Sequence, residues 1–176
     1  MKPQTSFTIW LTGLSGSGKT TIASSFDRHL KSIGIKSVVL DGDVLRNGIS
    51  ADLDFSEASR SENIRRTAEI AKLFNQEGVL VIAALISPMR VDRRRAESII
   101  TPPRFKEVYI NTPLNICEAR DPKGLYKKAR TGQIKNFTGI DAPYEPPMKA
   151  MLEIDSEKET EAAIIQSLMS MIKKNV

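Results

Sequence analysis

The stretch Phe7-Thr8-Ile9-Trp10-Leu11-Thr12-Gly13-Leu14-Ser15-Gly16-Ser17-Gly18-Lys19-Thr20 decides the fold of this chain. Its first part is apolar and β-prone, and its second part fits the phosphate-loop pattern G-x-x-x-x-G-K-[ST]. Glycines let backbone N–H groups wrap a phosphate, and the helix expected from Lys19 to Ile33 directs its positive end at the anion. In this pattern Lys19 reaches the terminal phosphates of a nucleotide, and Thr20 offers its hydroxyl to Mg²⁺. The alternative is a plain glycine-rich turn.

Strand and helix signals alternate along the rest of the chain. Apolar runs predict further strands at residues 37–40, 79–86, 107–110 and 151–154, and helices are expected at residues 56–76, at 91–100, in stretches up to about Arg130, and at the C-terminal end. This order predicts an α/β fold with a mainly parallel five-stranded sheet and helices on both faces, in a single domain over residues 1–176. Residues 131–147 are rich in Gly and Pro turns, which predicts a mobile loop.

Three loops are expected to meet at one edge of the sheet. Ligands bind beyond the carboxyl ends of parallel strands, and the loops after Leu11, Leu40 and Ile86 all follow such ends. Carboxylates at Asp41 and Asp43 can hold Mg²⁺ through water or orient an attacking hydroxyl, and the alternative is a helix-capping turn. Alternation along the strand points both carboxylates the same way, which suggests a shared function. A kinase acting on a small molecule is favoured, since no N-K-x-D motif of a G protein is found.

The overall composition leaves the partner of the protein open. Lys plus Arg number 26 against 21 for Asp plus Glu, a net charge of +5 that indicates an anionic partner or merely a solvated basic surface. The sole cysteine, Cys117, excludes an internal disulfide framework and is interpreted as a small buried hydrophobe. Met1 to Ser6 lack the apolar run of a secretory signal, and no apolar run is long enough to span a bilayer. We therefore expect a cytoplasmic protein.

A second set of side chains is suited to a nucleotide-like ligand. Arg60 and Asn63 are three apart on the expected helix from Ser56 and face one side. Beside Phe55 they provide a cation, an amide and a stacking ring, and Arg46 adds a second cation. The alternative is a capped surface helix with one core phenylalanine.

At this point the chain resembles the adenylyl-sulfate (APS) kinases. The matching stretches are Leu40 to Arg46, Asp52 to Ser56, Arg60, Glu62 to Arg66, Ile86 to Pro88, Asp121 to Ala129 and Ile134 to Asp141. The resemblance covers roughly Ser6 to Ile154, and its stretch from Asp121 to Glu145 is the most specific because no fold requirement dictates those loop residues.

The resemblance implies an ATP-dependent kinase of adenosine 5′-phosphosulfate. It implies ATP and Mg²⁺ as cofactors, transfer of the γ-phosphoryl group to the 3′-hydroxyl to give PAPS and ADP, a homodimer, and no nucleic-acid or membrane partner. Lys19 and Asp43 are the implied catalytic residues, with Ser87 as a further candidate because its counterpart has been treated as a phosphoserine position. The implied substrate-binding residues are Asp43, Arg46, Phe55, Arg60, Asn63, Ile86, Ser87, Lys123, Asn136 and Phe137, and residues 131–147 become a lid.

Some alternatives stay open at the level of sequence. Asn47, Asp54 and Met89 depart from the family pattern without removing a proposed catalytic group. The ring of Phe137 either stacks on a base or pins its loop to the core. Another small-molecule P-loop kinase, an inactive nucleotide-sensing module, and nucleic-acid binding through the basic clusters at residues 90–95 and 127–130 are the competing hypotheses.

Overall fold

The computed structural model of this chain describes residues 6–173. The stretch Met1 to Ser6, from which we predict no secretory signal, lies outside the described residues except for Ser6. Among residues 6–173, no helix is long and apolar enough to cross a bilayer.

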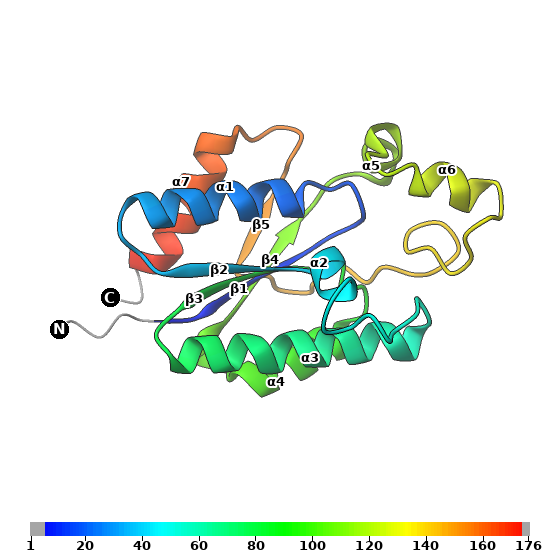
Figure 1. Ribbon diagram of the computed structural model, residues 1–176. Coiled ribbons are helices and arrows are strands. Elements are labelled where there is room, and N and C mark those ends of the chain that lie inside the picture. Colours follow the sequence, from blue (N-terminus) through cyan, green and yellow to red (C-terminus); the bar gives the residue numbers. More distant parts are fainter. Residues whose placement is uncertain (1–5, 174–176) are drawn as a thin grey trace.

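Strands and helices alternate along the described chain (Figure 1). The strands are β1 (Thr8–Thr12), β2 (Ser37–Asp41), β3 (Leu80–Ala84), β4 (Phe105–Ile110) and β5 (Leu152–Ile154). The helices are α1 (Lys19–Ser32), α2 (Gly42–Arg46), α3 (Glu57–Gln76), α4 (Arg90–Ile100), α5 (Leu114–Arg120), α6 (Leu125–Arg130) and α7 (Glu161–Lys173), with one 3₁₀ turn, η1 (Pro102–Arg104). All five predicted strands and the long predicted helices are confirmed.

The strands form one parallel sheet in the order β2-β3-β1-β4-β5. The first strand is therefore central: Thr8 is paired with Val81 of β3 on one side and with Phe105 of β4 on the other. All five residues of β1 and of β3 are buried, as expected for strands covered on both faces. The predicted α/β class and the five-stranded parallel sheet are thus correct.

Helices cover both faces of this sheet (Figure 1). Ile9 and Leu11 of β1 pack with α1 and α7 on one face, whereas Trp10 packs with α3 and α4 on the other. The alternation follows from the period of two along a strand. The stripe of α7 belongs to the first of these cores, because Ile164, Leu168 and Met171 are buried there, as predicted.

The structure differs from the prediction directly after β2. We expect a loop there, but Gly42–Arg46 form the short helix α2, and the Asp41 side chain caps it by accepting a hydrogen bond from the backbone N–H of Asp43 at 2.9 Å. The period-two argument for Asp41 and Asp43 therefore does not apply, because Asp43 lies in a helix, although both residues line the same cavity. The expected strand over residues 79–86 is also shorter, since β3 ends at Ala84.

Candidate active site

The phosphate loop leaves the carboxyl end of β1 and leads into α1. Gly13 has a φ of 153°, and a Cβ atom there would lie 2.7 Å from the Ile110 carbonyl oxygen. Gly16 has a φ of 74°, and its Cβ would lie 3.0 Å from the Cys117 carbonyl oxygen. Side chains at these two positions would clash with backbone, so the tight loop requires glycine. The loop is the predicted phosphate cradle in its expected place between strand and helix.

Lys19 is buried inside this loop. Its ammonium donates to the carbonyl oxygens of Gly13 and Leu14, at 2.9 and 2.6 Å. Burial lowers the pKa of the Lys19 side chain to about 8, and the carboxylates of Asp41 and Asp43 oppose this shift. The group is therefore mainly a cation at neutral pH, in a place where water does little to screen its charge.

Two oxygen-bearing side chains lie next to the first turn of α1. Thr20 Oγ1 donates to Asp41 Oδ2 at 2.7 Å, which joins the phosphate loop to the end of β2. Within the described chain no group of three or more His, Cys, Asp and Glu side chains is arranged to hold a metal ion. A hydroxyl and a carboxylate are nevertheless the oxygen ligands with which proteins hold Mg²⁺ when a nucleotide supplies the remaining ones.

Asp43 faces the segment that follows α5. Its carboxylate contacts the ammonium of Lys123 in an ion pair that joins residues 80 positions apart. Both side chains are more than half exposed, at 63% for Asp43 and 51% for Lys123, so the pair lies open to the cavity described next. The geometry therefore presents one carboxylate and one ammonium at the same point.

A cavity of about 840 Å³ joins these loops at the carboxyl ends of the strands. Its lining includes the following predicted site residues: Ser15, Gly16, Gly18, Lys19, Thr20, Asp43, Arg46, Phe55, Arg60, Asn63, Ile86, Ser87, Lys123 and Phe137. Four predicted residues, Gly13, Leu14, Ser17 and Asn136, do not line it. The predicted meeting of three loops at one sheet edge is thus confirmed.

An aromatic ring and two arginines form one wall of the cavity. The guanidinium of Arg46 lies over the Phe55 ring, 4.5 Å from its centroid, and that ring is 63% exposed. Arg60 donates to the carbonyl oxygens of Phe55 and Asn136, at 2.9 and 2.6 Å. Asn63 is buried, and its Oδ1 atom has no hydrogen-bond partner. The wall therefore offers a ring face, positive charge and an unpaired amide oxygen to a ligand.

Ser87 also lines the cavity, in an unusual backbone conformation. Its φ is 39°, and its side chain accepts a hydrogen bond from the Trp10 indole N–H at 3.1 Å. The serine is only 3% exposed. Its hydroxyl is therefore held by the core, although the residue lines the cavity.

Phe137 lies in the loop between α6 and β5. Its ring packs edge-on against Tyr126, with centroids 4.9 Å apart, and only 7% of the residue is exposed. The Asp141 carboxylate accepts hydrogen bonds from the backbone N–H groups of Asn136 and Phe137 and so closes this turn. The ring both pins the loop to the small cluster around Tyr126 and lines the cavity, so the two interpretations of Phe137 are compatible.

Arg93 of α4 is buried, so it does not belong to the basic surface that the cluster at residues 90–95 suggested. It is 2% exposed, and its guanidinium binds Glu107 at 2.6 Å and the carbonyl oxygens of Ser87 and Glu145, at 2.6 and 2.7 Å. The cluster at residues 90–95 therefore loses one of its cations to the interior. Arg93 instead ties the cavity wall at Ser87 to the end of the loop that carries Phe137.

Sequence reasoning missed one side of the cavity. Arg120 donates to the Gly16 carbonyl oxygen at 3.4 Å and to Ser156 Oγ at 3.3 Å, and Glu159 lies nearby in the lining. The place of Ser156 in the site could have been predicted from the sequence, because this residue follows the carboxyl end of β5. The rule that selected the loops after β1, β2 and β3 applies equally to that one.

Comparison with known proteins gives the family context. The model of the adenylylsulphate kinase family matches residues 5–155. The adenylyl-sulfate kinase of Geotalea daltonii is 48% identical over 165 residues, which are 94% of this chain and 81% of that protein. The solved APS kinase of Mycobacterium tuberculosis, in complex with AMPPNP and APS, is 44% identical with a TM-score of 0.92 and covers 96% of this chain and 98% of its own.

A further relative is informative about assembly. The hexameric APS kinase of Thiobacillus denitrificans is 26% identical, with a TM-score of 0.74. The match covers 98% of this chain and 30% of that one. The kinase unit therefore occurs within a larger chain in at least one relative.

Proposed function

The chain belongs to the adenylylsulphate kinase family, and we propose that the cavity at the carboxyl ends of its strands is the active site of an adenylyl-sulfate kinase. The enzyme transfers the γ-phosphoryl group of ATP to the 3′-hydroxyl of adenosine 5′-phosphosulfate and yields ADP and PAPS, in sulfate activation. The observation that carries this assignment is the single cavity that holds Lys19, the Asp43–Lys123 pair and the Arg46–Phe55 wall.

The phosphate loop binds ATP. Its backbone N–H groups and the start of α1 attract the phosphates, and the Lys19 ammonium adds a full positive charge. The Lys19 ammonium lies within this loop, where it donates to the carbonyl oxygens of Gly13 and Leu14. Arg120 and Ser156 lie beside the same loop. The nucleotide is therefore bound on the β1–α1 side of the cavity.

The wall that begins at α2 binds adenosine 5′-phosphosulfate. Phe55 offers its exposed face to the adenine, and Phe137 approaches from the loop after α6. Arg46 and Arg60 attract the phosphosulfate, and the free Oδ1 of Asn63 accepts a hydrogen bond from the substrate. The wall thus binds this substrate through stacking, charge and one hydrogen bond.

Asp43 positions the attacking hydroxyl. Its carboxylate accepts a hydrogen bond from the 3′-hydroxyl, whose oxygen then attacks the γ-phosphorus in line with the departing ADP oxygen. The new bond joins the 3′-oxygen to phosphorus, the bond to the β–γ bridging oxygen breaks, and the hydroxyl proton passes to Asp43. Lys19 and Lys123 neutralise charge on the transferring group. Direct transfer needs no phosphoserine, and the hydroxyl of Ser87 is engaged by Trp10.

Thr20 and Asp41 are the residues that fit a magnesium ion. Their oxygens are hydrogen-bonded to each other at 2.7 Å beside the phosphate loop. A bound Mg²⁺ supplies positive charge to the phosphate oxygens of ATP. The Thr20 hydroxyl and the Asp41 carboxylate are the protein oxygens that would hold the ion, and the nucleotide would supply others.

Residues 131–147 form the lid of the site. The loop contains no helix or strand of its own, and Phe137 fastens one part of it to Tyr126. Its far end is fixed by Arg93, which binds the Glu145 carbonyl oxygen. Closure of the loop over both substrates excludes water, which would otherwise accept the phosphoryl group.

We also propose that the enzyme is a cytoplasmic homodimer. A homodimer of the single domain over residues 1–176 in the cytoplasm agrees with the family resemblance. Light scattering of the purified chain distinguishes a dimer from a monomer and from the hexameric assembly of the Thiobacillus denitrificans relative.

The activity is tested by measuring ADP release. We expect micromolar adenosine 5′-phosphosulfate to stimulate ADP release from MgATP and to be converted to PAPS with one-to-one stoichiometry. Gluconate and a plain nucleoside are the matched acceptors that should not stimulate release. Stimulation by either of these, without a response to adenosine 5′-phosphosulfate, would assign the chain to another small-molecule kinase.

Replacement of Phe137 tests the stacking role. Phe137→Ala should raise the Kd for adenosine 5′-phosphosulfate, since base–aromatic stacking contributes about 1–3 kcal/mol per base. The measurement is calorimetry in the presence of ADP. Phe137→Leu is the control, because leucine preserves most of the packing against Tyr126 without a ring face. An affinity in Phe137→Leu equal to that of the wild type would show that the ring only packs the loop.

A further inference from the structure

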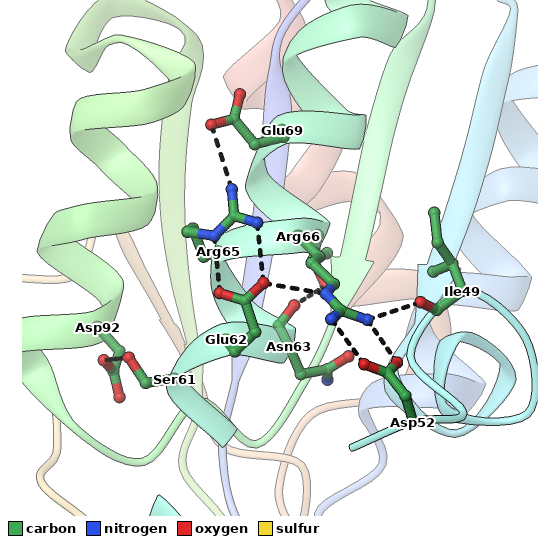
Figure 2. A network of polar contacts seen from close by, with 10 residues as sticks. Ile49, Asp52, Ser61, Glu62, Asn63, Arg65, Arg66, Glu69 and Asp92 are labelled. Carbon is green, nitrogen blue, oxygen red and sulfur yellow. Dashed lines mark hydrogen bonds and ion pairs between the residues drawn. The ribbon is translucent and has the colours of Figure 1, made fainter. Parts of the chain in front are cut away.

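A network of charged side chains connects the outer face of α3 to the segment between α2 and α3. Figure 2 shows Glu62, Arg65 and Arg66 on one helix turn, with Asp52 and Ile49 of the connecting segment to one side. Glu62 accepts hydrogen bonds from Arg65 at 2.7 and 2.8 Å and from Arg66 at 3.0 Å. These bonds lower the pKa of Glu62 to about 2, so it is ionised throughout the neutral range. The network is not needed for the transfer chemistry described above.

The two arginines of this network bind different parts of the chain. Among residues 6–173, Arg65 forms ion pairs with residues of its own helix alone, Glu62 and Glu69. Arg66 binds Glu62 but also crosses to the segment, where it holds both carboxylate oxygens of Asp52 at 2.6 and 2.8 Å and the Ile49 carbonyl oxygen at 2.9 Å. A planar guanidinium with several donors is suited to hold such a set of acceptors at once. Arg66 is therefore a clasp between α3 and residues 49–52.

The clasped segment carries the substrate wall. It begins after Arg46 and ends at Phe55, and Arg46 donates to the carbonyl oxygen of Asp54 at 2.7 Å while its guanidinium lies over the Phe55 ring. Residues 47–55 form turns without strand pairing, and Phe55 is 63% exposed. Arg46 and Arg60 hold the end of this segment at the carbonyl oxygens of Asp54 and Phe55, whereas Arg66 holds its first half at Ile49 and Asp52. Turn-rich segments with exposed side chains open at low free-energy cost, so each contact to a neighbouring helix narrows the positions that the segment occupies.

The clasp restricts the position of residues 47–55 more than it raises the free energy of unfolding of the whole domain. Its side chains are partly exposed, at 25% for Arg66 and 60% for Asp52, and exposed ion pairs contribute little to global stability. The cost of removing them is thus a wider range of positions for the segment. Substrate binding would then have to restore the order that the clasp provides.

We propose that Arg66 is a positioning residue that, through Asp52 and the Ile49 carbonyl, holds the segment between α2 and α3 so that Arg46 and Phe55 face the acceptor substrate. The inference rests on the proposed function, because it assigns this wall to adenosine 5′-phosphosulfate. Arg66 does not contact the substrate, and its effect is specific to that substrate. ATP is bound on the other side of the cavity, by the loop after β1.

Steady-state kinetics of Arg66→Ala test this role. We expect the KM for adenosine 5′-phosphosulfate to rise roughly fivefold, while kcat and the KM for ATP stay within about twofold of the wild type. Arg65→Ala is the matched control: it removes a neighbouring arginine from the same helix and the same Glu62, but no contact with the segment. It should leave all three constants near those of the wild type.

Asp52→Ala extends the test from the other side of the clasp. This variant should raise the same KM, and the double variant with Arg66→Ala should be no worse than the more impaired single variant, because both remove one interaction. Arg66→Lys should resemble Arg66→Ala, since an ammonium cannot hold Asp52 and Ile49 in the fixed fork of a guanidinium.

Several results would overturn the inference. Equal values of kcat and of both KM constants in the Arg66→Ala and Arg65→Ala variants would show that the network has no role in positioning the segment. A parallel rise in the KM for ATP would indicate general loosening of the domain. Additive effects of Asp52→Ala and Arg66→Ala would show that they act separately. A wild-type protein that shows no response to adenosine 5′-phosphosulfate would contradict the proposed function instead, so the two failures are distinguishable.

Discussion

Lys19→Ala is expected to lower kcat by roughly a thousandfold or more, because it removes the positive charge next to the transferring phosphoryl group. Lys19 lies inside the phosphate loop, where its charge is poorly screened. The interaction strengthens as charge develops on the phosphoryl oxygens, so the loss should appear in kcat as well as in the KM for ATP. Quench-flow or coupled measurement of ADP release over a wide enzyme range detects the residual rate.

The loss of activity in this variant should not come from unfolding. The folded protein holds the Lys19 ammonium away from water with no carboxylate within hydrogen-bond distance, which is an unfavourable environment for a charge. The midpoint of thermal unfolding of Lys19→Ala without nucleotide should therefore not fall. Lys31→Ala is the control, because Lys31 lies at the far end of the same helix and pairs only with Asp27. A near-normal kcat in Lys19→Ala would contradict the assigned role.

Asp43→Asn is expected to lower kcat by about a hundredfold to ten-thousandfold, the range typical for loss of a general base. The amide occupies the same space but cannot accept the proton of the 3′-hydroxyl. Because the phosphate loop is unchanged, the KM for ATP should change little. Single-turnover formation of PAPS from pre-bound substrates measures the chemical step directly and separates it from product release.

The ion pair of Asp43 provides the control for this experiment. If Asp43 only holds Lys123 in place, then Lys123→Met should impair the enzyme as much as Asp43→Asn does. If Asp43 orients the hydroxyl, Asp43→Asn should be clearly the more impaired of the two, and Lys123→Met should retain part of the charge stabilisation through Lys19. Equal rates in the two variants would argue against the base.

Much of the fold could be predicted from the sequence because its signals are local. The apolar run that contains β3 and the spacing of Ile164 and Leu168 on α7 report burial directly. The helix α2 was predicted only as the alternative of a helix-capping turn at Asp41 and Asp43, which the structure confirms, because five residues are too few to show a helical period. Short capped helices are recognised only when the capping hydrogen bond is seen.

The parts of the site that follow from the sheet topology could be predicted. The contacts between residues far apart in the sequence could not. Because ligands bind beyond the carboxyl ends of parallel strands, the loops after β1, β2 and β3 were correctly predicted to meet at one site. In the sequence Arg93 looks like one of several surface arginines, because its partner Glu107 lies on β4 and its carbonyl acceptor at Glu145 is 52 positions away. The pairing of Asp43 with Lys123 likewise joins segments whose approach no local pattern reveals.

The central place of β1 in the sheet also has a consequence for folding. Thr8 emerges early during synthesis, but its partners in the sheet are Val81 and Phe105, and the tight turn at Gly16 rests on the backbone of Cys117. The order of strands therefore gives the domain a high contact order, which slows folding. The phosphate loop cannot reach its final shape until most of the chain has been made, so a nascent chain that ends before α5 should have no formed nucleotide site.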